Sequence, residues 1–229
     1  IFALLPVEKE IPPSPRETLE ELNKRLPVTL YFHNDVPNPK SWDTLTTLNY
    51  LTTYSEYTEM LPRYQKEYAT GLNASKAEEA KEDIEDFFTE HVDQGVKDLE
   101  LFRDLLLEEL QKGARVKIAV RGFASPLAKT DYNVNLTKRR ISSLINYLKE
   151  YDGGVFIPFI DGTDSTKGKV VFEYIPFGEY NANQLISDNP NDTKNSIYSR
   201  AAAAERKIEI QNISYLEPQD IFPITIVQP

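Results

Sequence analysis

The chain has 229 residues, with 26 lysines and arginines against 36 aspartates and glutamates, which gives a formal net charge of −10 at pH 7. Its length suits one large domain or two small ones, and its 40% hydrophobic and 11% aromatic content excludes a wholly disordered chain. Nucleic-acid affinity comes mainly from basic side chains that neutralise phosphates, so this acidic chain is not expected to bind nucleic acid.

The sequence contains no cysteine, which excludes disulfides, thiolate metal sites, cysteine nucleophiles and lipid-bearing cysteines within these residues. No stretch approaches the roughly 18 apolar residues of a membrane-spanning helix, so no transmembrane segment is expected. The opening run of residues 1–5 is too short for the core of a signal peptide and lacks a basic flank. Because the chain begins with isoleucine, we interpret it as a fragment or a processed form.

The first elements lie among prolines. Residues 1–16 are expected to form an extended arm, because proline fixes φ and removes a backbone donor. Leucines at helical spacing predict a short helix over Arg16–Leu26. The β-rich run Val28–His33 predicts a strand, which ends at a loop containing Pro37 and Pro39.

Two long helical segments are predicted next. Ser41–Tyr68 has a helical pattern, with Ser41 as a plausible N-cap and Gly71 as the stop. Ser75–Lys112 repeats apolar residues at steps of three and four, with acidic residues on the other faces. Gly95 is expected to bend or divide this second segment.

The second half of the chain alternates between strand-like and helical patterns. Arg115–Phe123 alternates apolar and polar residues like a strand, and Asn133–Tyr151 is helical up to Gly153. The other predicted elements are strands over Val155–Ile160, Lys169–Ile175 and Lys207–Gln211, an alanine-rich helix over Ser196–Glu205, and an edge strand in the tail at 216–229. This order predicts an α/β fold, namely a two-layer sandwich whose helices cover a small mixed sheet.

Catalysis and metal binding find little support in the sequence. His33 and His91 are the only histidines, and none of the common nucleophile, phosphate-loop or zinc motifs occurs. The many acidic residues are most simply the solvated face of an amphipathic helix. The oxygen-rich stretches Asp161–Asp164 and Asp188–Asp192 lack the spacing of a calcium loop, so turns are favoured over a metal site. No catalytic residue, metal or cofactor is assigned.

A strand-loop-helix segment from Arg121 to Arg140 offers a candidate binding site. On its helix Asn133, Thr137 and Arg140 are spaced i, i+4 and i+7, so they share a face. Arg140 is expected at the boundary between sheet and helix, partly shielded, with its guanidinium aimed at the strand-to-helix loop. Two interpretations stay equally open: the guanidinium binds a ligand carboxylate bidentately, or it pairs with one of the nearby acids.

This segment resembles the signature of the OmpA C-terminal-like domain, the peptidoglycan-associating module of Gram-negative outer-membrane proteins. The residues in the same register are Gly122–Ser125, Tyr132-Asn133, Leu136-Thr137 and Arg140-Ile141. Further pieces in the same order are Leu30–Phe32, Phe177–Glu179, Asp188-Asn189, Ser199–Ala201 and Glu205–Ile210. The resemblance divides the chain into an arm and short helix (1–27), an OmpA-like domain (28–215) with a helical insertion at about 41–112, and a tail (216–229).

The resemblance implies non-covalent binding of the peptide stem of peptidoglycan, through an aspartate and an arginine that grip the charged ends of diaminopimelate. Arg140 and Asn133 match the family pattern, but Ser125 occupies the aspartate position. A serine hydroxyl cannot pair with an ammonium as a carboxylate does, so Asp131 or Asp35 is expected to compensate. The candidate ligand-binding residues are Asn34, Asp35, Ser125, Asp131, Asn133, Thr137, Arg140 and Arg200.

Two functions follow as hypotheses. The first is a non-catalytic, periplasmic domain that anchors an outer-membrane protein or complex to peptidoglycan, with other outer-membrane proteins as further partners. The alternative is a protein-interaction scaffold of the same fold, in which the acidic insertion and the apolar tail bind a partner and the ancestral site is degenerate. A carboxylate-based hydrolase acting on the cell wall is a distant third.

Overall fold

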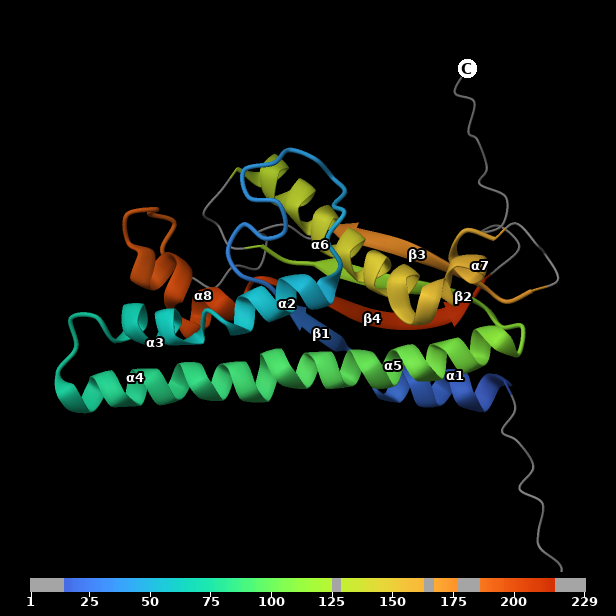
Figure 1. Cartoon of the computed structure of the whole chain (residues 1–229), viewed down its shortest axis with the longest axis horizontal. Coiled ribbons are helices and arrows are strands. Elements are labelled where there is room, and N and C mark those ends of the chain that lie inside the picture. Colours follow the sequence, from blue (N-terminus) through green and yellow to red (C-terminus); the bar gives the residue numbers. More distant parts are fainter. Residues whose placement is uncertain (1–14, 125–128, 163–166, 177–185, 217–229) are drawn as a thin grey trace, which may run out of the picture.

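A computed structural model describes residues 15–124, 129–162, 167–176 and 186–216 (Figure 1). Its centre is a four-stranded mixed sheet in the order β1-β4-β2-β3. The strands are β1 (Val28–Tyr31), β2 (Arg115–Gly122), β3 (Lys169–Pro176) and β4 (Lys207–Tyr215). β2 and β3 are parallel, whereas β4 runs antiparallel to both β1 and β2. The predicted α/β class is confirmed, and the four strands match predicted ones.

One face of the sheet forms the main core. Helices α1 (Pro15–Lys24), α5 (Gln94–Gln111) and α6 (Thr130–Glu150) pack against it. Along β2 the burial follows the alternation in the sequence: Val116, Ile118 and Val120 are buried. Arg115, Lys117 and Arg121 are only partly buried. α1 contributes fully buried Leu22 to this core, and its Asn23 side chain exchanges two hydrogen bonds with the Ile213 backbone.

A long helix runs along the bottom of the molecule in Figure 1. It consists of α4 (Ala74–Phe87), a π-helical segment η1 (Phe88–Asp93) and α5, without a break between them. Of the two predicted effects of Gly95, a bend or a division, the division does not occur. The role of Gly95 is close packing, since a Cβ at this position would lie 2.2 Å from the Thr29 carbonyl oxygen on β1.

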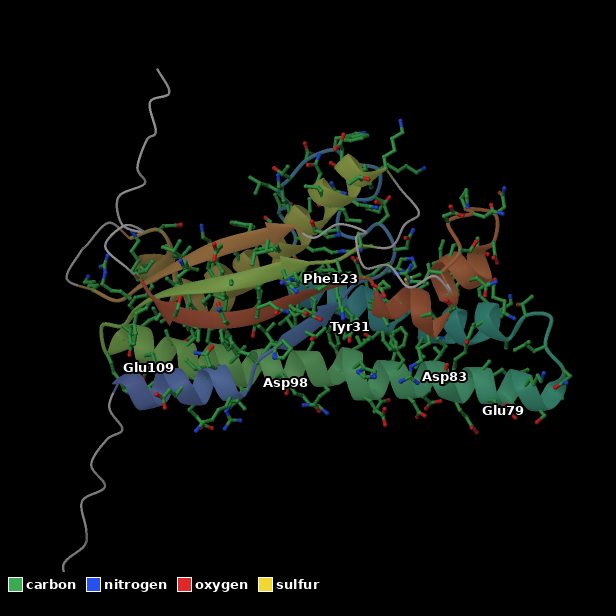
Figure 2. The ribbon with its side chains drawn as sticks, turned by 180° about the vertical axis from the view of Figure 1, so that it is seen from behind. Tyr31, Glu79, Asp83, Asp98, Glu109 and Phe123 are labelled. Atoms are coloured by element: carbon green, nitrogen blue, oxygen red, sulfur yellow. The ribbon has the colours of Figure 1, made fainter. Side chains whose placement is uncertain are left out.

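The acidic residues of this helix are spread along its length, as Figure 2 shows for Glu79, Asp83, Asp98 and Glu109. Most of them are exposed, and Asp83, Asp93 and Asp98 are half-buried. Glu109 is buried, and its carboxylate pairs with the Lys112 ammonium at 3.0 Å. The distribution agrees with an amphipathic helix whose acidic face is solvated.

The predicted helix over Ser41–Tyr68 is wrong in its first part. Residues 41–49 are irregular, and Ser41 is not an N-cap. The first helix, α2 (Tyr50–Thr58), is capped by the Asn49 side chain, and α3 (Leu61–Ala69) follows with proline in its first turn. Asp35, Asn38 and Lys40, just before this segment, all have positive φ, which excludes a continuous helix over residues 35–40.

The predicted strand over Val155–Ile160 is also wrong. The chain instead forms a short 3₁₀ turn, η2 (Tyr151–Gly154), and the helix α7 (Ile157–Ile160). Asp152, Gly153 and Gly154 all have positive φ, which reverses the chain after α6. Phe156, the residue before α7, is fully buried in the main core, and Val155, Phe159 and Ile160 pack partly buried against it.

A second cluster of buried aromatic residues joins the insertion to the C-terminal part of the chain. η3 (Lys194–Tyr198) and α8 (Arg200–Ala204) replace the single helix predicted over Ser196–Glu205. The cluster is formed mainly by Tyr31, Tyr57, Tyr64, Ile84, Phe87, Phe88, Val92, Tyr198 and Ala203. The predicted insertion at 41–112 is thus part of the packed structure, and it contributes buried residues to both the main core and the second cluster.

Several predictions lie outside the described residues: the extended arm over 1–14, the Phe177–Glu179 turn, residues 163–166 of the 161–168 turn, and the edge strand of the tail. Among the helices that the structure describes, none combines the length and apolar character that crossing a membrane requires.

Candidate functional site

Arg140 lies at the centre of the candidate site and is fully buried, more than the partial shielding that its spacing predicts. Its Nη1 donates to the Phe123 carbonyl at 2.8 Å, so the guanidinium does point to the strand-to-helix loop after β2. Nε donates to the Val36 carbonyl at 3.0 Å and Nη2 to the His33 carbonyl at 3.4 Å. Arg140 therefore ties the loop after β1 to the loop after β2.

Arg139, which the sequence reasoning did not single out, fixes the same loop further along. It is fully buried, and it donates to the carbonyls of Pro37 at 3.0 Å and of Ser41 and Asp43 at 2.7 Å. Asparagines of α6 add bonds to the carbonyls of Trp42, Thr46 and Leu48. The polar face of α6 thus holds residues 33–49 through their backbone, which explains why this stretch is not helical.

The two carboxylates expected to replace the family aspartate have different surroundings. Asp35 is half-buried and accepts hydrogen bonds from the Tyr132 hydroxyl and from the Lys40 backbone N–H. Asp131 is exposed in the first turn of α6 and forms no hydrogen bond or ion pair with other described residues. Of these two, Asp131 is the carboxylate that is available to a ligand ammonium.

The other predicted site residues divide into two groups. Asn34 follows β1, and Asn133 and Thr137 lie on the first turns of α6, so all three are near Arg140. Thr137 packs closely on Gly122, because a Cβ added to Gly122 would lie 2.5 Å from the Thr137 Cβ. Arg200 is not part of this group, because its Nη1 pairs with Asp83 at 2.6 Å on α4. Ser125 lies outside the described residues.

Burial and neighbouring cations shape the electrostatics behind the site. Burial, reinforced by the positive charge of Arg206, lowers the pKa of Arg140 to about 9. Burial and the charges of Arg206, Arg63 and Arg140 lower the pKa of His33 to about 3. His33 is therefore neutral at physiological pH, and a hydrogen bond of 2.8 Å joins its Nδ1 to the Tyr64 hydroxyl.

We expect the depressed pKa of His33 to make the fold less stable in acid. Below about pH 6.5 the histidine is protonated in the unfolded chain but still neutral in the folded chain. The free energy of unfolding therefore falls by at most about 1.4 kcal/mol for each pH unit of acidification. The loss stops near pH 3, where folded His33 is also protonated. Urea unfolding at pH 7 and pH 4.5 should show a loss that is smaller in His33→Gln by up to about 2.5 kcal/mol. Identical losses in both proteins would contradict this role of His33.

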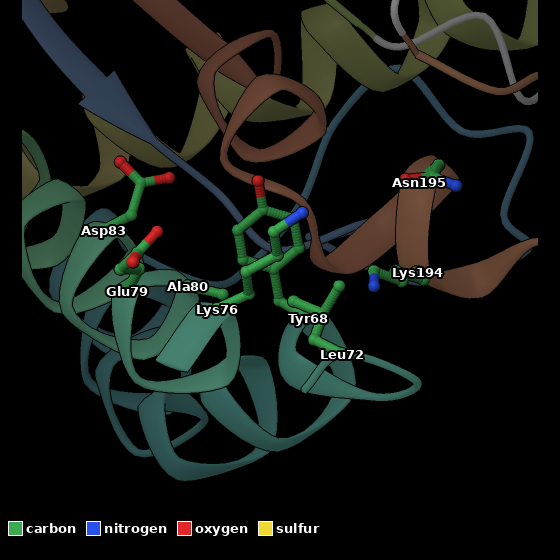
Figure 3. A pocket seen from close by; sticks show the side chains of 8 residues that line it. All are labelled: Tyr68, Leu72, Lys76, Glu79, Ala80, Asp83, Lys194 and Asn195. Carbon is green, nitrogen blue, oxygen red and sulfur yellow. The ribbon is translucent and has the colours of Figure 1, made fainter. Parts of the chain in front are cut away.

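A separate groove lies between α3, α4 and η3, with a volume of about 480 Å³. In Figure 3 Glu79 and Asp83 stand on one side, Lys194 and Asn195 on the other, and Tyr68 between them. The Asp83 carboxylate is already paired with Arg200. Because the groove carries both signs of charge and an aromatic wall, it suits a polar segment of a partner protein better than a single small ion.

The loop held by α6 exposes two large apolar side chains. Trp42 is 60% and Leu45 68% exposed. The Trp42 ring packs edge-on against Tyr132, with 5.3 Å between ring centroids, and the Arg139 guanidinium lies 5.4 Å from the centroid of the same tyrosine. A backbone fixed by so many hydrogen bonds presents these side chains in a preorganised way.

Comparisons with known proteins assign nothing further. No protein-family model matches the chain, and no curated protein or solved structure matches it significantly. No family is shown. The resemblance to the OmpA-like family therefore stays a prediction from the residues of the sequence.

Proposed function

We propose that this chain is a non-catalytic binding domain for the peptide stem of peptidoglycan, of the two-layer OmpA-like type. The observation that carries the proposal is the bridge formed by Arg140, which brings the loop after β1 and the loop after β2 together at the start of α6. Four predicted site residues lie at or beside these loops: Asn34 and Asp35 follow β1, and Asp131 and Asn133 lie in the first turn of α6, where the Tyr132 hydroxyl donates to Asp35.

The start of α6 suits a zwitterionic group such as the end of a diaminopimelate side chain. Lys129, the N-cap residue, supplies no side-chain hydrogen bond to the first turn, and N–H groups at a helix N-terminus favour a carboxylate. Asp131 offers an exposed carboxylate to the ammonium. In this proposal Arg140 is a positioning residue, because a ligand would have to displace three backbone carbonyls to reach its guanidinium.

The proposal places the chain in the periplasm, where peptidoglycan is available, and gives it the task of anchoring an outer-membrane protein or complex to the wall. Other outer-membrane proteins are its further partners in this proposal.

The alternative function is a protein-interaction scaffold with a degenerate peptidoglycan site. One observation favours it specifically: Arg140 is completely buried, and each of its three nitrogens donates to a carbonyl. In this alternative the partner binds the exposed Trp42 and Leu45, or the groove between α3, α4 and η3.

Co-sedimentation with insoluble diaminopimelate-type peptidoglycan tests the proposal. We expect the wild type to sediment and Asp131→Asn to bind roughly 10- to 100-fold more weakly, the effect of losing one charge-assisted hydrogen bond. Asp86→Asn, which removes an exposed carboxylate from α4, is the matched control and should bind like the wild type. Equal sedimentation of Asp131→Asn and wild type would remove Asp131 from the site. If the wild type stays in solution, the scaffold replaces the first proposal.

A further inference from the structure

A buried guanidinium without an acidic partner lies behind the candidate site. Arg206 joins α8 to β4 and is 1% exposed. Its Nη2 donates to the Ile197 carbonyl and, at 3.5 Å, to the Tyr64 hydroxyl; its Nη1 reaches the Ser196 carbonyl at 3.5 Å. No carboxylate in the described part of the chain forms an ion pair with it. A buried charge without a counter-ion is costly, so this arrangement calls for an anion.

Three polar atoms near Arg206 and Tyr64 are shielded from solvent and form no hydrogen bond of good geometry with the described residues, although the Tyr57 hydroxyl has the Tyr64 hydroxyl as a polar neighbour. They are the Tyr57 hydroxyl, the Ser196 hydroxyl and Nε of Arg206. Arg206 Nη1 donates to the Ser196 carbonyl, so Ser196 is a neighbour of Arg206. The Tyr57 ring packs on the Tyr64 ring, with 5.6 Å between their centroids. All three atoms can donate a hydrogen bond, and Nε can do nothing else.

The surroundings of these donors are positive. His33 contacts both Tyr57 and Tyr64, with 6.1 and 5.7 Å between ring centroids, and stays neutral. Arg140 reaches the His33 carbonyl from the other side. A water molecule here would fill hydrogen bonds but would leave the charge of Arg206 uncompensated. An anion that only accepts hydrogen bonds would satisfy the donors and the charge together.

We propose that a monoatomic halide, such as chloride, binds beside Arg206 Nε and accepts hydrogen bonds from the hydroxyls of Tyr57 and Ser196. The ligand is small because the donor atoms are closed to solvent. The ion links α2, η3 and the start of β4, so it is a structural component of the second core. This site is independent of the proposed peptidoglycan function.

Halide-linked stability of the full chain tests the site. Unfolding is measured at pH 7 and constant ionic strength, with sodium chloride or bromide replacing sodium gluconate, whose organic anion is too large to enter. Above the dissociation constant, each tenfold rise in chloride should raise the folding equilibrium constant up to about tenfold. Bromide should act in the same way, and a crystal grown in bromide should show an anomalous peak at Arg206 Nε.

Variants locate the effect. Tyr57→Phe and Ser196→Ala remove one donor each with little change in volume, and both should weaken the chloride dependence; Arg206→Met should abolish it. Tyr68→Phe, in the separate groove, is the control and should behave like the wild type. Equal stability of the wild type in chloride and gluconate would overturn the proposal. So would a chloride dependence that is unchanged in both Tyr57→Phe and Ser196→Ala, or a bromide peak found only on the surface.

Discussion

Replacing Arg140 with alanine should lower the free energy of unfolding by about 3–5 kcal/mol, the range for removing one partner of a buried charged network. The substitution removes the guanidinium donor from the carbonyls of Val36, Phe123 and His33, of which the His33 carbonyl keeps the Val36 N–H at 3.3 Å. Each buried acceptor that is left unsatisfied costs about 1–3 kcal/mol. Since small domains are stable by only about 5–15 kcal/mol, the variant is expected to be close to unfolding.

Urea unfolding of Arg140→Ala beside Arg25→Ala checks this expectation. Arg25 is an exposed arginine that pairs with Glu21 at 3.2 Å, so its loss should cost less than about 1 kcal/mol. Equal stability of the two variants would mean that Arg140 does not hold the loops. The result also bears on binding studies, because lost wall binding in Arg140→Ala would report the loss of loop structure as well as any loss of ligand contact.

Replacing Gly95 with alanine should destabilise the fold by about 1–3 kcal/mol, the usual cost of forcing an extra carbon into a packed site. The new Cβ would lie 2.2 Å from the Thr29 carbonyl oxygen, and a backbone atom of a hydrogen-bonded strand cannot move aside as a flexible side chain does. This steric cost outweighs the gain of up to about 1 kcal/mol in helix propensity.

The matched control for Gly95→Ala is Lys97→Ala, an exposed position two residues further along α5. Its change in unfolding free energy should stay within about 0.5 kcal/mol. A Gly95→Ala protein as stable as the wild type would show that α5 does not approach β1 as closely as the structure has it.

Local periodicity was sufficient to predict most regular elements. The alternation in β2 and the apolar spacing in α5 and α6 are strong because each element buries one face against the same core. The predictions failed where the backbone is determined by distant residues. Residues 41–49 read as helical, but their carbonyls are taken by Arg139 and by asparagines of α6, about 100 positions away in the sequence.

The spacing of residues on α6 predicted which of their side chains share a face, but it did not predict their burial or their partners. The motif brings Asn133, Thr137 and Arg140 to one place because they share a helix face, which spacing alone reveals. Whether an arginine is exposed or buried depends on which carbonyls the fold brings near it, and spacing carries no such information. Arg139 and Arg206 were missed for this reason, although the arginine pair at 139–140 was a visible signal.

The central claim is that a peptidoglycan stem peptide binds at the start of α6. The most direct measurement is a titration of the isotope-labelled chain with a soluble diaminopimelate-containing stem peptide, followed by backbone NMR shifts. We expect saturable shifts concentrated at residues 33–36 and 129–133, and we expect Asp131→Asn to weaken them. Shifts confined to the groove of Tyr68 and Lys194, or no shifts at all, would contradict the claim and favour the interaction scaffold.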